Sequence, residues 1–190
     1  MIRAFIAVCI DSGTLENVLA VTSQLKRRIP GVRWVAKENL HLTVKFLGPI
    51  DEAYVEPISR MLEVAIRPFP RFSINAKGLG VFPDFKQPRI LWVGLQGIEM
   101  VSLASEIDST LEALGFEPEK RSFKPHLTIG RWRHFDGSAT RLKRVLEEWK
   151  NYQFGESKVE ALTLFQSITK PEGAVYHSLK SVALAGDVKL

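Results

Sequence analysis

The sequence predicts an α+β protein whose two halves follow the same plan. Short segments in which apolar and polar residues alternate, as in half-buried strands, are interspersed with longer segments of helical period. The tripeptide His-Leu-Thr occurs once in each half, at residues 41–43 and 126–128. A doubly wound α/β sheet has a similar order of elements, but no glycine-rich nucleotide loop follows the first strand, so we expect the α+β class.

The first half begins with an apolar strand over residues 2–10, which Asp11 ends. An amphipathic helix follows, and then a strand over residues 40–46 in which His41 and Thr43 alternate with apolar side chains. The positions that mark the buried side of the helix are Leu15, Val18, Leu19, Thr22, Leu25 and Ile29.

The second half repeats this order of strand, helix and motif strand. A strand is expected over residues 89–95, then a helix that ends at Gly115, then a strand that carries His126 and Thr128. The apolar positions of this helix are Leu103, Ile107, Leu111 and Leu114. The repeated order indicates an internal duplication.

Each motif strand is followed by a further predicted helix, over residues 51–66 and 138–149. Three more strands are predicted over residues 72–76, 159–166 and 175–184. We draw no boundary within the chain and expect one domain over residues 1–190.

The repeated motif places an imidazole beside a hydroxyl. Residues i and i+2 of a strand point to the same face, so His41 is expected beside Thr43 and His126 beside Thr128. Two histidines can divide the acid and base roles that a displacement at phosphorus needs, while a threonine hydroxyl can donate to a phosphoryl oxygen. A single His-x-Thr is more often structural, but two copies in a chain with only four histidines favour a phosphate-handling site.

The composition is typical of an intracellular enzyme with a polyanionic partner. The 190 residues are 45% hydrophobic, and the net charge is +5 with a pI near 9.4. The single cysteine, Cys9, excludes an internal disulfide and a cysteine-based metal site, and its apolar neighbours predict a buried thiol. No apolar run reaches the length of a membrane span, so we expect a cytoplasmic protein.

Clusters of basic residues favour RNA as the partner. Residues 26–28 precede a Pro-Gly pair that ends a helix, and we expect them to be solvated. Arg131 is the expected phosphate ligand; in an unbroken strand it would face away from His126, but a bulge at Gly130 or a strand end would redirect it. Lys45 is expected on the face of the first motif as a solvated lysine.

Nearly the whole chain resembles the 2H phosphoesterases, and within them the RNA 2',3'-cyclic phosphodiesterases formerly described as 2'-5' RNA ligases. The resemblance extends well beyond the two motifs. It covers residues 3–8, 34–35, 38–48, 78–83, 88–94 and 123–131 and, more weakly, residues 164–167 and Tyr176. In one departure, Gly130 stands where many relatives have alanine before the arginine that follows the second motif.

The resemblance implies two pseudo-symmetric lobes of antiparallel sheet backed by helices, with the motif strands facing each other across a central cleft. It implies that His41 donates a proton and His126 accepts one as an RNA 2',3'-cyclic phosphate is hydrolysed to a 2'-phosphate, with no metal or other cofactor. Thr43, Thr128 and Arg131 would bind the phosphate. By microscopic reversibility the same site could join RNA ends through a 2'-5' bond. We expect a monomer whose substrates include tRNA fragments or other cyclic-ended RNA.

Other interpretations stay open at this point. A noncatalytic RNA-binding module would keep the cleft, although the intact motifs count against it. A metal-dependent phosphodiesterase is disfavoured because neither motif histidine has a carboxylate or second histidine at common ligand spacing. Related enzymes act on other cyclic phosphates or on 2'-5' oligonucleotides. Phe46 and Trp92 could stack on a base, but their alternation with apolar residues predicts that both pack in the core.

Overall fold

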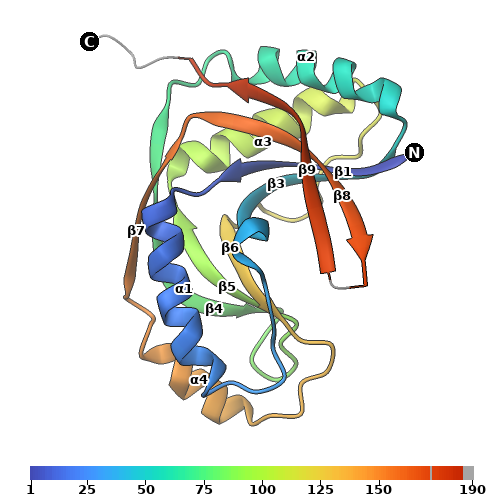
Figure 1. Cartoon of the computed structure of the whole chain (residues 1–190). Helices are drawn as coiled ribbons and strands as arrows, with labels where there is room; N and C mark the ends of the chain where they lie inside the picture. Colours follow the sequence, from blue (N-terminus) through green and yellow to red (C-terminus); the bar gives the residue numbers. More distant parts are fainter. Residues whose placement is uncertain (172, 186–190) are drawn as a thin grey trace.

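The computed structural model describes residues 1–171 and 173–185 (Figure 1). Within these residues the chain forms a nine-stranded sheet with four α-helices, which confirms the α+β class. The strands are β1 (Ile2–Cys9), β2 (Arg33–Trp34), β3 (His41–Ile50), β4 (Phe72–Phe82), β5 (Ile90–Gln96), β6 (His126–Arg131), β7 (Gln153–Val159), β8 (Ala161–Lys170) and β9 (Gly173–Ala183). The helices are α1 (Ser12–Lys26), α2 (Val55–Ile66), α3 (Ile98–Glu112) and α4 (Ala139–Glu147), with 3-10 turns η1 (Lys37–Asn39) and η2 (Glu52–Tyr54). The last five residues of the domain expected over 1–190 lie outside the described part.

The sheet narrows at its centre to one residue pair. Its strands follow the order β7-β4-β5-β6-β3-β1-β8-β9, with antiparallel neighbours, and β2 adds to β6. Between the described strands β3 and β6 the register contains only Leu42 opposite Leu127, the central residues of the two motifs. The sheet therefore consists of a half with β7, β4, β5, β6 and β2 and a half with β3, β1, β8 and β9, and the two halves meet where the motifs lie.

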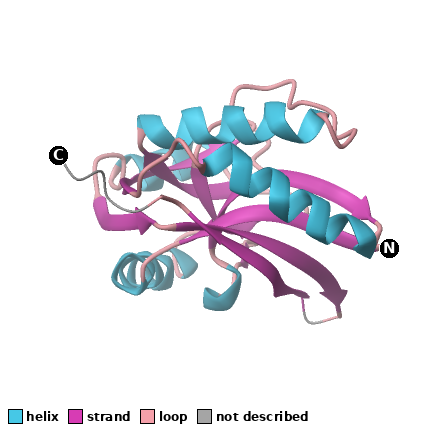
Figure 2. Ribbon diagram, turned by 90° about the horizontal axis from the view of Figure 1, so that it is seen from above, coloured by secondary structure: helices cyan, strands magenta, loops and turns pink. Residues whose placement is uncertain are grey.

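Helices cover both halves of the sheet, and α1 and α3 each pack on the half opposite to the strand that precedes them in the sequence. α1 and α4 contact β7 and β4, whereas α2 and α3 contact strands of the β3-β1-β8-β9 half. Figure 2 shows the strands in the middle of the molecule with helices outside them on both sides. α1 follows β1 in the sequence but packs on β7, where the Asn17 amide donates to the Phe154 carbonyl (2.7 Å) and the Thr14 hydroxyl donates to the Glu156 carbonyl (2.9 Å). A helix that follows a strand of one half of the sheet therefore covers the other half.

The motif leucines anchor the two central strands. Leu42 and Leu127 are fully buried in the core. Because side chains alternate along a strand, this fixes the histidine and threonine of each motif on the opposite face of the sheet. The same alternation predicted the orientation from sequence.

Two strands differ from the prediction. The strand expected over residues 72–76 continues to Phe82 as β4, and β7 was not predicted at all. β7 contains Gly155, Glu156 and Lys158, which weaken its alternating pattern. One face of the strand is buried because α1 packs against it. Tertiary contacts between distant segments therefore decide this strand.

β3 contains a β-bulge directly after the first motif. Thr43 pairs with Ala7 and Lys45 pairs with Ile6, so Val44 is an extra residue. The extra residue reverses the alternation and turns Lys45 to the buried side, where it is 4% exposed. The expectation of a solvated lysine on the motif face is wrong for this reason.

β6 contains a bulge in the same place after the second motif. Thr128 pairs with Trp92 and Gly130 pairs with Leu91, which leaves one extra residue between Thr128 and Gly130. The reversed alternation returns Arg131 to the face of the second motif. Both features that the sequence offered for redirecting Arg131 are therefore present, a bulge beside Gly130 and the end of β6 at Arg131 itself.

Candidate phosphoryl-transfer site

The five candidate residues line one cleft at the junction of the two halves of the sheet. His41 and Thr43 reach it from β3, and His126, Thr128 and Arg131 reach it from β6. The cleft has a volume of about 220 Å³. Residues far apart in the sequence meet here because both motifs flank the single pair that joins β3 to β6.

His41 is held through both ring nitrogens. Its Nδ1–H donates to the Asn39 carbonyl oxygen at 2.8 Å, and its Nε2 lies 3.0 Å from the Thr43 hydroxyl. The side chain of Asn39 in turn donates to the Ala174 carbonyl of β9 at 2.7 Å. The hairpin of β8 and β9 therefore fixes the segment that orients His41.

His126 is held by the equivalent backbone contact. Its Nδ1–H donates to the Lys124 carbonyl oxygen at 2.7 Å, again two residues before the histidine. A carbonyl oxygen only accepts, so in both neutral rings the proton lies on Nδ1 and Nε2 carries the lone pair. Both imidazoles thus present Nε2 as the nitrogen that exchanges protons.

Aromatic rings surround the imidazoles. Phe5 stacks on His41 with ring centroids 4.8 Å apart, and Tyr176 contacts His41 edge-on at 5.1 Å. Phe82 contacts His126 edge-on at 5.0 Å. These contacts restrict both rings and exclude water from one side of each.

Burial shifts the acidity of both histidines in the same direction. It lowers the pKa of His41 to about 4; the hydrogen bond to Asn39 opposes this shift, and the positive charge of Arg131 adds to it. Burial likewise lowers the pKa of His126, again opposed by its backbone hydrogen bond and strengthened by Arg131. Both rings are therefore neutral at pH 7 without a ligand, and an anion bound between them would raise both pKa values.

The threonines and Arg131 make the cleft suitable for an anion. Thr43 and Thr128 are half-buried at its wall, and Arg131 is exposed at its mouth. Two hydroxyl donors and a guanidinium can bind the nonbridging oxygens of a phosphate while the two Nε2 atoms face its reacting bonds.

Phe46 is not part of the core. Its side chain is 64% exposed at the cleft, with its ring 6.2 Å from that of Phe5. The bulge after the first motif places it there, five residues after His41 as Arg131 is five residues after His126. The prediction that Phe46 packs inside is wrong, whereas Trp92 is half-buried against Phe82, at 5.1 Å.

Cys9 is exposed, which corrects the prediction of a buried thiol. It is the last residue of β1 and pairs with the first residue of β3, His41. Val8 and Ile10 on either side of it are buried. The alternation of side chains along the strand therefore turns Cys9 to the other face, towards solvent.

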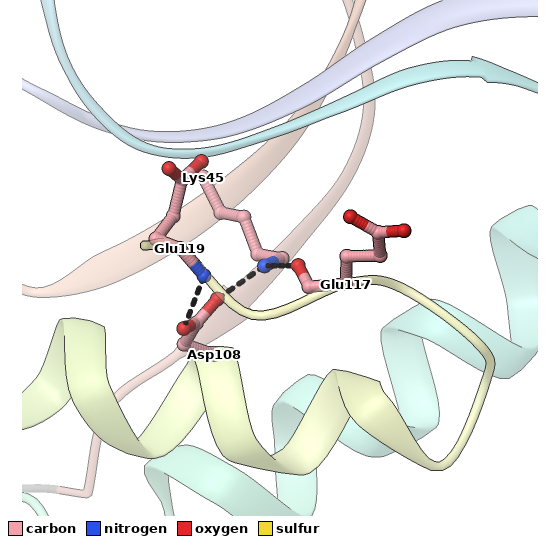
Figure 3. A network of polar contacts seen from close by, with 4 residues as sticks. All are labelled: Lys45, Asp108, Glu117 and Glu119. Carbon is pink, nitrogen blue, oxygen red and sulfur yellow. Dashed lines mark hydrogen bonds and ion pairs between the residues drawn. The ribbon is translucent and has the colours of Figure 1, made fainter. Parts of the chain in front are cut away.

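Lys45, on the far side of the bulge, belongs to a buried polar network (Figure 3). Its ammonium group binds the Asp108 carboxylate of α3 and donates to the Glu117 carbonyl at 2.9 Å. Asp108 also accepts from the Glu119 amide at 2.8 Å. The network ties β3 and α3 to the loop that leads to β6, so it supports the strand that carries His126.

A family model described as LigT-like phosphoesterase matches residues 10–92 and 96–176. The chain belongs to this family. The RNA 2',3'-cyclic phosphodiesterase of Methanocaldococcus jannaschii is 36% identical to it over 178 residues, 94% of this chain and 98% of that protein. The protein of the same name from Aquifex aeolicus is 32% identical over 190 residues, 98% and 99% of the two chains.

Solved structures share the fold of this LigT-like phosphoesterase. TT0787 of Thermus thermophilus matches with a TM-score of 0.81 at 25% identity, over 97% of this chain and 98% of that one. Escherichia coli LigT complexed with 3'-AMP matches with a TM-score of 0.78 at 23% identity, with the same coverage. The expected family membership, fold and enzyme class are confirmed.

Sequence reasoning missed three contributors to the site of this phosphoesterase. Asn39 and Phe5 lie in the segments that carry the family resemblance, and Tyr176 lies at its weaker end, yet none has a motif of its own. Asn39 contacts His41 through its carbonyl, which every residue has, and its side chain bonds a backbone carbonyl of a distant strand, so neither contact is visible in the sequence. Phe5 and Tyr176 look like ordinary strand aromatics until the strands are placed together.

Within residues 1–171 and 173–185, no group of three histidine, cysteine, aspartate or glutamate side chains is placed to hold a metal ion. In that same part of the phosphoesterase, no helix has the length and apolar character of a membrane span.

Proposed function

We propose that this phosphoesterase hydrolyses 2',3'-cyclic phosphate ends of RNA to 2'-phosphates by paired-histidine catalysis. The observation that carries the proposal is the cleft itself, where two imidazoles whose Nδ1–H groups are bound to backbone carbonyls lie with two threonines and Arg131. The names of the relatives in Methanocaldococcus jannaschii and Aquifex aeolicus supply the substrate class. The basic net charge of +5 favours the same polyanion.

In the proposed reaction a water molecule attacks phosphorus as the bond from phosphorus to the ribose 3' oxygen breaks. Nε2 of His126 takes a proton from the water, and Nε2 of His41 gives a proton to the departing oxygen. Burial and the charge of Arg131 lower the pKa of both rings, so the division between donor and acceptor is the one that the family resemblance implies. Each turnover ends with the proton on His126 instead of His41, and exchange with solvent restores the starting state.

The substrate anion supplies what the free site lacks. Its negative charge raises the pKa of His41, so that binding brings the proton that the reaction uses. Thr43, Thr128 and Arg131 bind the nonbridging oxygens as charge develops on them. Phe46, exposed beside His41, stacks on the base of the terminal nucleotide.

The proposal includes further expectations. The enzyme works without a metal, as a monomer in the cytoplasm, on cyclic-ended RNA such as tRNA fragments. The same atoms can run the same displacement with an RNA 5'-hydroxyl in place of water, which would form a 2'-5' bond as the 3' oxygen departs.

The test is product analysis. The purified protein is incubated with a short RNA ending in a 2',3'-cyclic phosphate in the presence of a chelator, and the product is identified by mass and phosphate position. A new 2'-phosphate end is expected. A 3'-phosphate end, or turnover that the chelator abolishes, would contradict the proposal.

A further inference from the structure

A second hollow of about 440 Å³ lies beside the catalytic cleft and shares none of its lining residues. β4 and β5 form its floor, and the segment that precedes β6 forms one side. Its side chains include Lys77, Trp92, Phe123, Lys124 and Lys150. We call it the lysine hollow.

Strand register places the lysine hollow on the same face of the sheet as the second motif. Thr128 pairs with Trp92, His126 pairs with Gly94, and Gly94 pairs with Lys77. Paired residues of antiparallel strands share a face, and neighbouring strands are about 4.8 Å apart. Lys77 is two strands away from His126, so the hollow begins about 10 Å from it, within reach of the next nucleotide of a strand.

The charge of the lysine hollow is positive and only partly neutralised. Lys150 pairs with Glu147 at 2.9 Å. Lys77 and Lys124 have no carboxylate within ion-pair distance in the part of the chain that the structure describes, and the described lining contains no acidic residue. Two unpaired ammonium groups favour an anion with more than one charge.

The floor of the lysine hollow is aromatic. The indole of Trp92 lies flat over Gly80, where an added Cβ would be 2.2 Å from the ring, so only glycine leaves room for it. Phe123 lines the same hollow. An aromatic surface with adjacent free lysines is the combination that binds single-stranded nucleic acid, because bases pack on rings and phosphates pair with ammonium groups.

We propose that the lysine hollow binds the nucleotide that precedes the cyclic-ended one in the same RNA strand. Lys77 and Lys124 bind its phosphates, and its base packs against the aromatic floor. This inference rests on the proposed function, since it assigns that site an oligonucleotide substrate in preference to a nucleoside cyclic phosphate.

The first arm of the test is binding. The probe is a fluorescein-labelled RNA tetranucleotide with a 2'-phosphate end, and its Kd is measured by anisotropy for the wild type, Lys77→Ala and Lys77→Glu. The control is Lys26→Glu, because Lys26 is exposed in the last turn of α1 and lines neither hollow nor cleft. We expect Lys77→Glu to weaken binding about tenfold and Lys77→Ala less, with the control near wild type. Equal Kd values for Lys77→Glu and the control would overturn the proposal.

The second arm is the ratio of kcat/KM for a cyclic-ended tetranucleotide to that for a nucleoside 2',3'-cyclic phosphate. The wild-type ratio is expected to exceed about ten, and Lys77→Glu should reduce it towards one. A ratio near one in the wild type, or one that the substitution leaves unchanged, would contradict the proposal. If neither substrate turns over, the proposed function fails, while the binding arm still decides the role of the hollow.

Discussion

Both motif histidines donate Nδ1–H to a carbonyl oxygen two residues earlier, which is Asn39 for one and Lys124 for the other. Because every residue has a backbone carbonyl, the residue that accepts this bond can have any side chain. The contact fixes the tautomer of the histidine, but the sequence does not reveal it. The histidines and threonines themselves were predictable, because strand alternation and duplication are both readable from the chain. Their acidity was not predictable, since it depends on burial beneath residues such as Phe5 and Tyr176 and on the charge of Arg131.

The lowered histidine pKa values predict that kcat/KM falls as pH rises above 6.5. The reaction uses one proton on the pair, at His41, and both pKa values of the free protein lie below 6.5, His41 at about 4. Above both values the protonated fraction falls about tenfold for each pH unit. A pH profile measured with a cyclic-ended RNA checks this.

Arg131→Gln provides the control for that profile. Removal of the positive charge should raise the pKa of both histidines and move the falling limb of the profile to higher pH. Weaker phosphate binding in this variant lowers kcat/KM but does not remove the shift of the limb. A kcat/KM that stays constant or rises from pH 6.5 to 8 in the wild type would contradict the assignment.

The division of roles predicts a selective rescue. A cyclic phosphate with sulfur in place of the 3' oxygen releases a thiolate, which needs no proton, so it should restore most of the rate lost in His41→Ala. The same substrate should not rescue His126→Ala, because attack still needs a base. The measurement is the rate of each variant with the 3'-oxygen substrate and with the 3'-sulfur substrate. Rescue of His126→Ala alone would reverse the assignment.

At the scale of elements, the two bulges decide which side chains reach the cleft. The bulge in β6 was predictable because Gly130 marks it, but the bulge in β3 has no glycine, so Lys45 and Phe46 were assigned to the wrong faces. A bulge is a property of the pairing of two strands, and the sequence of one strand does not specify it. The shared position of the two bulges makes Phe46 the counterpart of Arg131.

The buried network around Lys45 should be strongly coupled. Asp108→Ala leaves the ammonium group of Lys45 buried without its carboxylate, which we expect to cost about 3 kcal/mol in the free energy of unfolding. The double variant Lys45→Met/Asp108→Ala removes the buried charge and should recover part of that loss. Urea unfolding of Lys45→Met, Asp108→Ala and the double variant measures the coupling, and strictly additive losses would show that no such pair stabilises the fold.

At the scale of the whole molecule, the two halves are joined by crossing helices more than by the sheet. α1, from the start of the chain, covers β7, and α3, from the middle, contacts β3. The order of elements was predictable from the sequence, but this crossing was not. The helical period of apolar residues shows which face of a helix is buried, but it does not show which strands that face packs against. The arrangement brings two motifs that lie far apart in the sequence to one cleft.

This crossing predicts a single cooperative unfolding transition. All four tryptophans lie in or near the half formed by β4 to β7, so fluorescence follows that half, whereas far-UV circular dichroism follows the whole chain. The two urea curves should coincide, because α1 follows β1 of one half and packs on β7 of the other, so neither half unfolds without breaking that contact. Two separated transitions would show that the halves fold independently.

Paired-histidine catalysis is tested most directly by the turnover of a short cyclic-ended RNA at saturating concentration. The rates of His41→Ala and His126→Ala are compared with that of the wild type, and circular dichroism checks that each variant is folded. We predict that each substitution lowers kcat by about a hundredfold or more, since each removes a proton-transfer group. A folded variant of either histidine that keeps a rate near that of the wild type would contradict the account.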